Sequence, residues 1–206
     1  MKQITIVDYG SGNILSAQKS FLKVTKDNNI EAKVLISNNL NDIKASTHVV
    51  LPGQGAFATC MAGLKKTPGL VDEIYDFAII KKRPFLGICV GMQMLAKDSE
   101  ENGLHEGLGW INGSIKPLPK KNLKMPHMGW SSVIPSKKNK LINDQDDYYF
   151  VHSYYFKCEN KENILAETQY GINFTSIVGK ENIYGVQFHP EKSSSSGLNL
   201  IKNFVS

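Results

Sequence analysis

Apolar and polar positions alternate along the first half of the chain with two periods, one typical of strands and one of helices. Short apolar runs of strand length occupy residues 4–8, 32–36, 48–51 and 85–88. Between them, apolar residues recur three and four positions apart, which is typical of amphipathic helices. We expect these helices at residues 14–24, 40–45, 57–64 and 70–82. Strands that alternate with helices in this way predict a parallel sheet covered by helices.

The pattern changes after residue 97, where glycines interrupt a loop-rich stretch. Strand-like segments then follow without clear helices between them, and we expect them at residues 114–118, 131–134, 148–156, 164–170, 175–178 and 183–188. A polar, exposed loop is expected at 137–147 and a closing helix at 198–205. We therefore predict an α/β fold with a central, mostly parallel sheet flanked by helices and added antiparallel hairpins. Without an internal repeat or linker, residues 1–206 should form a single domain.

Composition limits the class and location of the protein. A hydrophobic fraction of 41% is ordinary for a soluble globular protein, and no apolar run approaches the length of a membrane span. The N-terminus becomes acidic too soon for a signal peptide. Cysteines occur only at 60, 89 and 158, an odd count without metal-ligand spacing. Such usage suits a reducing, cytoplasmic location.

The net charge of +5 comes almost entirely from lysine, because Arg83 is the only arginine. Lysine pairs at 65–66, 81–82, 120–121 and 137–138 are spread along the chain and are not interleaved with aromatic residues. Arginine leads bidentate contacts to phosphates and bases, so a lysine-coated surface is favoured over a nucleic-acid partner. The histidines outside residue 189 are scattered without metal-ligand spacing, so we expect no metal and no cofactor.

The chemistry is concentrated first around Cys89. It follows the apolar run 85–88 and is flanked at two residues on each side by Gly87 and Gly91. This spacing predicts a sharp strand-to-helix turn, in which glycines are needed because backbone approaches backbone. At the N-terminus of the following helix, the helix dipole would favour the thiolate over the thiol. The alternative is a buried, inert cysteine between a core strand and a core helix.

Two further glycine pairs follow strands. Gly53 and Gly55 lie just beyond the strand at 48–51, where their backbone N–H groups are candidate oxyanion donors together with the amide of Val90. Taken alone, they would indicate a plain loop. The glycines at 10 and 12 lack the third glycine of a dinucleotide fingerprint, so a tight strand-to-helix turn is the favoured interpretation there.

The second decisive stretch is His189-Pro190-Glu191, at the end of the strand-like run 183–188. Pro190 disfavours helical geometry at His189, and in an extended chain side chains two residues apart share a face. The Glu191 carboxylate could then orient the His189 imidazole. His189 could deprotonate Cys89 and later protonate a leaving amine. The alternative is a surface ion pair at a strand end.

Taken together, the stretches 52–57, 84–93 and 187–193 resemble the class I (triad) glutamine amidotransferases. More narrowly, residues 8–13, 126–130, 149–154 and 192–194 are similar to those of the glutaminase subunits of imidazole glycerol phosphate synthases. The resemblance spans nearly the whole chain. It implies that Cys89 attacks the side-chain amide of glutamine with help from His189 and Glu191. It also implies that amides of Val90 and the Gly53 region hold the oxyanion.

The resemblance implies roles for further residues. The amino-acid end of glutamine would be held by Gln93, Ser153 and Tyr154. Ammonia would pass to a separate (β/α)₈-barrel cyclase subunit, the partner in a heterodimer that makes imidazole glycerol phosphate in histidine biosynthesis. Residues implied to face the cyclase are Asn13, Met128, Trp130, Tyr149 and Lys192. From sequence alone, the methionine and tryptophan of this set could instead be core residues; an exposed turn is the other possibility.

One residue departs from the family pattern. Gln54 stands between the two loop glycines, where the family usually has a small branched residue. Our hypothesis is that Gln54 stays outside the substrate pocket and leaves the triad competent. Three rival functions stay open: a glutaminase subunit for a different synthase, such as a sugar-modifying amidotransferase; a non-enzymatic binding module on the same scaffold; and a thiol peptidase.

Overall fold

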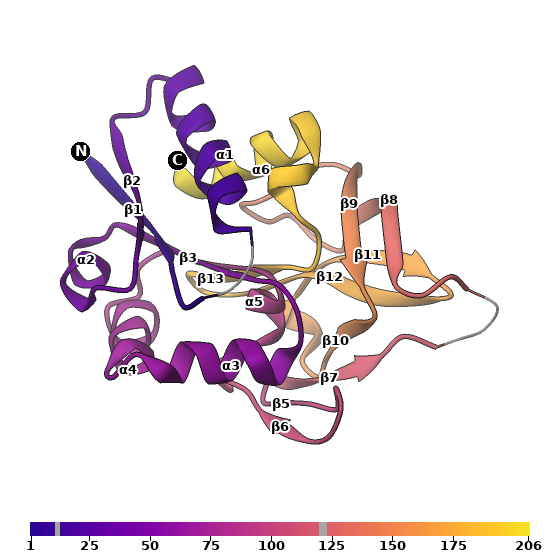
Figure 1. Cartoon of the computed structure of the whole chain (residues 1–206). Helices are drawn as coiled ribbons and strands as arrows, with labels where there is room; N and C mark the ends of the chain where they lie inside the picture. The colour runs from indigo at the N-terminus through magenta and orange to yellow at the C-terminus, as the bar shows by residue number, and fades with distance from the viewer. Residues whose placement is uncertain (11–12, 120–122) are drawn as a thin grey trace.

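Five parallel strands form one end of the sheet in the computed structural model, which describes residues 1–10, 13–119 and 123–206 (Figure 1). In spatial order they are β2 (Ala32–Ser37), β1 (Lys2–Val7), β3 (His48–Gly53), β4 (Phe85–Cys89) and β13 (Ile183–Val186). Strands β3 and β4 are buried along their whole length, as expected when helices cover both faces. The register places Gly53 beside Cys89, so the carboxyl ends of β3 and β4 meet at one edge.

Helices cover both faces of this parallel sheet (Figure 1). On one side lie α1 (Ile14–Asp27) and α6 (Ser194–Val205), which pack together through edge-to-face contact between Phe21 and Phe204, with ring centroids 6.4 Å apart. On the other side lie α2 (Leu40–Ala45), α3 (Phe57–Lys66) and α4 (Leu70–Tyr75), which continues into the π-helical turn η1 (Asp76–Ile80). Each longer helix buries one apolar stripe and exposes a polar one.

The second half of the chain adds antiparallel strands. Beyond β13 the sheet continues through β12 (Ile172–Lys180), β10 (Tyr154–Cys158), β7 (Gly113–Pro117), β5 (Asp98–Ser99) and β6 (His105–Glu106). A branch leaves β12 through β11 (Ile164–Tyr170) to β8 (His127–Pro135) and β9 (Asp146–His152). The remaining short elements are α5 (Val90–Gln93) and the 3₁₀ turns η2 (Lys161–Asn163) and η3 (Pro190–Lys192). This arrangement confirms the predicted α/β sheet with added hairpins.

Several boundaries differ from the sequence-based prediction. The single helix expected at 70–82 is divided between α4 and η1, and the strand expected at 148–156 breaks at Ser153 into β9 and β10. The loop expected to be exposed at 137–147 buries Leu141 and Ile142 and ends in β9. The closing helix begins earlier, at Ser194. The predicted turn around residues 11–12 and the lysine pair at 120–121 lie outside the described residues.

Among the described residues, the structure contains no helix with the length and apolar character needed to cross a membrane.

Close backbone approach at the end of β4 explains its glycines. A Cβ added at Gly91 would lie 1.8 Å from the carbonyl oxygen of Leu51, and one at Gly87 would lie 2.5 Å from the carbonyl oxygen of Gly91. Backbone atoms cannot move aside as a flexible side chain can. The turn after β4 therefore packs against β3 only if these positions lack side chains.

We predict that Gly91→Ala destabilises the protein by about 3 kcal/mol or more, because its methyl group overlaps the β3 backbone. Urea unfolding would measure the change. The control is Gly109→Ala, which adds a methyl group in open space at a positive φ of 69° and should cost only about 1–2 kcal/mol. Equal losses for the two variants would contradict this explanation.

Candidate active site

Cys89 occupies a strained turn between β4 and α5. Its φ of 55° and ψ of −112° are unusual for a residue with a side chain. This conformation is typical of a nucleophile elbow, in which the strand turns sharply and lifts the side chain away from the sheet. The following helix α5 is only four residues long. A helix this short offers much less dipole assistance than the longer helix that the sequence predicted.

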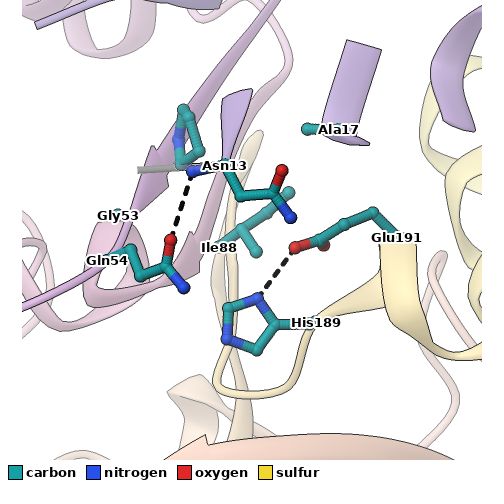
Figure 2. Close-up of a pocket in the computed structure, with 8 residues that line it drawn as sticks. Asn13, Ala17, Gly53, Gln54, Ile88, His189 and Glu191 are labelled. Atoms are coloured by element: carbon teal, nitrogen blue, oxygen red, sulfur yellow. Dashed lines mark hydrogen bonds and ion pairs between the residues drawn. The ribbon is translucent and has the colours of Figure 1, made fainter. Parts of the chain in front are cut away.

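The neighbouring group is the imidazole of His189. His189 Nδ1 lies 2.8 Å from Glu191 Oε1, and both side chains are almost fully buried, with 6% and 5% exposed. Cys89 interacts with the same ring, and this interaction raises the pKa of His189. Three residues from two distant segments therefore meet, as the sequence predicted. Figure 2 shows the histidine and glutamate side chains pointing toward each other.

The backbone route to this contact differs from the expected one. His189 is extended, with φ −101° and ψ 97°, as Pro190 requires. Glu191 lies in the 3₁₀ turn η3, so side-chain alternation along a continuous extended strand does not explain the contact. The turn folds the carboxylate back onto the ring. The His189 N–H donates to the carbonyl oxygen of Tyr149 in β9 at 2.9 Å, which fixes the histidine backbone beside the hairpin.

Electrostatics favour a protonated imidazole at this position. Burial by itself lowers the pKa of His189, but hydrogen bonds with Cys89 and Glu191 outweigh burial and raise the pKa from 6.5 to about 10. At neutral pH the ring is therefore an imidazolium. An imidazolium hydrogen-bonded to a thiol favours the thiolate, the form that acts as a nucleophile.

A pocket of about 250 Å³ opens beside Cys89. Six residues predicted for the site line it: Cys89, Val90, Gln93, Ser153, Tyr154 and His189. Gly55, which the sequence analysis offered as a candidate oxyanion donor, also lines the pocket. The sequence prediction did not place the remaining lining residues there: Gln54, Glu101, Pro126, Val151 and His152.

The loop at residues 53–55 is placed differently from the sequence-based prediction. Gly53 does not line this pocket but a smaller one, shared with Asn13, His189 and Glu191 (Figure 2). The expectation that Gln54 stays outside the substrate pocket is wrong, because it lines both cavities. Its Oε1 accepts a hydrogen bond from the Asn13 N–H at 3.2 Å. A polar side chain at this position therefore connects the glycine loop to the start of α1.

Gln93 is held in a fixed orientation inside the fold. Its Nε2 donates to the carbonyl oxygen of Tyr154 and to Gln187 Oε1, both at 3.0 Å. Gln187 in turn directs its Nε2 toward Cys89 Sγ at 3.8 Å. The sequence placed Gln187 within the histidine motif but gave it no role. Its position two residues before His189 was the only signal that could have indicated it.

The residues expected at a partner surface lie outside the pocket. In β8, Met128 and Trp130 are 61% and 53% exposed, which excludes the alternative that they belong to the core. They lie on a strand and not on an exposed turn. Tyr149 is paired with Trp130 across the hairpin, with ring centroids 5.9 Å apart. Lys192 follows Glu191 in η3. The hairpin thus presents aromatic side chains close to the triad backbone.

No group of three or more histidine, cysteine, aspartate or glutamate side chains suited to a metal ion occurs in the parts of the chain that the structure describes.

Comparison with known proteins places this arrangement in a family. Residues 5–206 match the family described as Glutamine amidotransferase class-I. The chain therefore belongs to the class I glutamine amidotransferases. It is similar to curated proteins named Imidazole glycerol phosphate synthase subunit HisH, being 42% identical to that of Rhodospirillum rubrum over 209 residues and 45% identical to that of Pelagibacter ubique over 207 residues. In both cases the alignment covers 98% of each chain.

Solved structures support the same fold. One glutamine amidotransferase superposes with a TM-score of 0.73 at 17% identity, covering 98% of this chain and 96% of the other. A second, from Thermotoga maritima, has a TM-score of 0.64 at 19% identity, covering 98% and 81%. The family resemblance inferred from the motifs is confirmed by the match over residues 5–206.

We predict that His189→Asn lowers the rate at which iodoacetamide alkylates Cys89 at neutral pH by about tenfold or more, because the thiolate loses its counter-cation. Glu191→Gln should lower it less, since the imidazole remains. Mass spectrometry would follow each cysteine separately. Glu162→Gln, which changes a carboxylate that is 86% exposed, serves as the control. An unchanged rate in His189→Asn would exclude the ion pair.

Proposed function

We propose that this protein is the glutaminase subunit of an imidazole glycerol phosphate synthase and supplies ammonia for histidine biosynthesis. The observation that carries the proposal is the contact of Cys89 with the His189–Glu191 pair at the mouth of a pocket that contains Gln93. The full-length similarity to HisH subunits supports the choice of this enzyme among amidotransferases.

In the first step, the Cys89 thiolate attacks the side-chain carbonyl carbon of glutamine and forms a tetrahedral intermediate. Its oxyanion is stabilised by backbone N–H groups of Val90 and the Gly53 region, because fixed donors cost no reorganisation during the reaction. The register that sets Gly53 beside Cys89 supports this role. Gly53 does not line the pocket beside Cys89. Its contribution to holding the oxyanion would come from its backbone N–H, because glycine has no side chain.

In the second step, the intermediate collapses and the carbon–nitrogen bond breaks. The His189 imidazolium gives its proton to the leaving nitrogen, so ammonia departs and a glutamyl thioester remains on Cys89. Neutral His189 then accepts a proton from water, whose oxygen attacks the thioester. Glutamate leaves and the thiolate–imidazolium pair is restored. Glu191 keeps Nδ1 of the ring protonated and directed, through its 2.8 Å hydrogen bond.

Glutamine would be held in the pocket beside Cys89. We assign its amino-acid end to Gln93 and to the backbone of Ser153 and Tyr154, which line that pocket. The break between β9 and β10 at Ser153 supports this assignment, because irregular backbone leaves polar groups for a ligand.

The partner would be a (β/α)₈-barrel cyclase subunit in a heterodimer. Its docking face on this chain would include Met128, Trp130 and Tyr149 on the β8–β9 hairpin, with Asn13 and Lys192 beside the triad. Exposed aromatic side chains of this kind are typical binding anchors. Direct transfer of ammonia across this interface has a physical reason: in water most ammonia is protonated and is no longer a nucleophile.

We further propose that residues 1–206 act as one glutamine amidotransferase domain in the cytoplasm, without a cofactor. The three free cysteines are compatible with a reducing compartment.

We predict that Cys89→Ala abolishes glutamine-dependent synthesis of imidazole glycerol phosphate but leaves synthesis from ammonium salts unchanged. The variant loses the nucleophile and keeps the docking face. The assay mixes the chain with the cyclase and its nucleotide substrate. Loss of both activities would place the defect in folding or docking. Full glutamine-dependent activity would refute the assignment of Cys89.

We also predict that Trp130→Ala weakens binding to the cyclase by about tenfold or more, as expected for an aromatic anchor. The matched control is Ile134→Ala in the same strand, which removes an apolar side chain of similar exposure, 51% against 53%. Calorimetric titration would measure both dissociation constants. Equal effects of the two substitutions would contradict a specific docking role for Trp130.

A further inference from the structure

Two buried histidines form a pair beneath the β8–β9 hairpin. His127 in β8 and His152 in β9 are directly opposite each other in the strand register. They are 2% and 6% exposed, and His127 Nδ1 lies 2.9 Å from His152 Nε2. Neither residue had a role in the sequence analysis. Buried polar groups of this kind are retained at a cost unless fully hydrogen-bonded, so their partners need to be identified.

The hydrogen bonds around the pair fix the direction of every proton. His152 Nδ1 lies 2.8 Å from the carbonyl oxygen of Tyr154, which can only accept, so Nδ1 is protonated. Nε2 of neutral His152 is then the acceptor, and His127 Nδ1 donates to it. The remaining His127 nitrogen accepts from the hydroxyl of Ser131 at 2.9 Å. Burial lowers the pKa of both rings, to about 4 for His127 and about 3 for His152, so both are neutral at physiological pH.

This chain of hydrogen bonds ends at the proposed glutamine site. The Tyr154 carbonyl that accepts from His152 also accepts from Gln93 Nε2 at 3.0 Å. Gln93 continues to Gln187, whose Nε2 points at Cys89 Sγ. His152 itself lines the pocket beside Cys89. The histidine pair therefore holds the backbone that sets the orientation of Gln93.

The other end of this series of hydrogen bonds lies in β8, the strand that carries the exposed side chains of Met128 and Trp130. His127 immediately precedes Met128, and side chains of adjacent strand residues point to opposite faces. Below the strand, the His127 ring is stacked between Phe150 and Tyr170, with centroids 4.9 and 3.9 Å away and interplanar angles of 20° and 18°. A shift of β8 at its outer face would therefore displace His127, and with it the hydrogen bond that it donates to His152.

We propose that His127 and His152 are positioning residues, a hydrogen-bonded relay that links the outer strand β8 to the Tyr154 carbonyl and Gln93 and so prepares the pocket for glutamine. This inference rests on the proposed glutaminase function and adds residues to it. The histidines act through Tyr154 and Gln93 and form no bond with the reacting atoms.

The test compares His127→Phe with His127→Asn in the complete synthase. Phenylalanine keeps the stacking between Phe150 and Tyr170 but cannot donate to His152. Asparagine can place an amide N–H close to the position of Nδ1. We expect His127→Phe to raise the KM for glutamine about tenfold, the loss expected for one buried hydrogen bond. His127→Asn should stay within about threefold of the native KM. Ammonium-dependent synthesis should be unchanged in both.

The proposal is overturned if His127→Phe has the native KM, or if both variants are equally impaired, because the hydrogen bond would then have no role of its own. If His127→Phe does not fold, the same comparison is made with His152→Asn, which keeps a donor for the Tyr154 carbonyl, and His152→Leu, which does not. Equal KM values for those two variants would likewise overturn it. Failure of the glutaminase assignment would look different, because the native complex would not use glutamine at all.

Discussion

The structure depends on an interaction that cannot form within a local stretch of chain, between the sulfur of Cys89 and the protonated imidazole of His189. The parallel sheet brings them together, because β4 and β13 are neighbours and both end at the same edge. Burial of His189 would by itself make its ring neutral. Interactions with Cys89 and the Glu191 carboxylate reverse this effect and raise the pKa of His189 to about 10. The charge state of His189 therefore depends on both side chains that contact its ring.

The turn at Cys89 shows how the fold sustains this pair. A non-glycine residue at φ 55° is strained, and it persists only where neighbouring packing fixes it. Here the fixing contact is made by glycines, since Gly91 lies against the Leu51 carbonyl and Gly53 against the Gly91 amide. Strand β3, which packs against the turn that holds Cys89, also leads into the proposed oxyanion loop. One contact, between β3 and the turn after β4, thus fixes the position of Cys89 and places the proposed oxyanion donors beside it.

Local sequence signals predicted most of the parallel half and the triad. Apolar runs located β1 to β4, and the spacing of Gly87, Cys89 and Gly91 indicated the elbow. The antiparallel half was predicted less accurately, because its breaks depend on tertiary contacts: Ser153 interrupts an otherwise continuous strand pattern to line the pocket. The same reason explains why Gln54, Gln187 and His152 were missed or misplaced. Their roles depend on contacts with residues distant in sequence, and the spacing of apolar and polar residues does not indicate such contacts.

The central claim is that His189 stays protonated at neutral pH beside Cys89. The most direct measurement is nitrogen NMR of the intact protein with labelled histidine, followed from about pH 6 to about pH 9. The account predicts that His189 stays an imidazolium across this range and that Cys89→Ala lowers its pKa, because the interaction with the sulfur is removed. A His189 ring that is neutral at pH 7, or whose titration is the same with and without the sulfur, would contradict it.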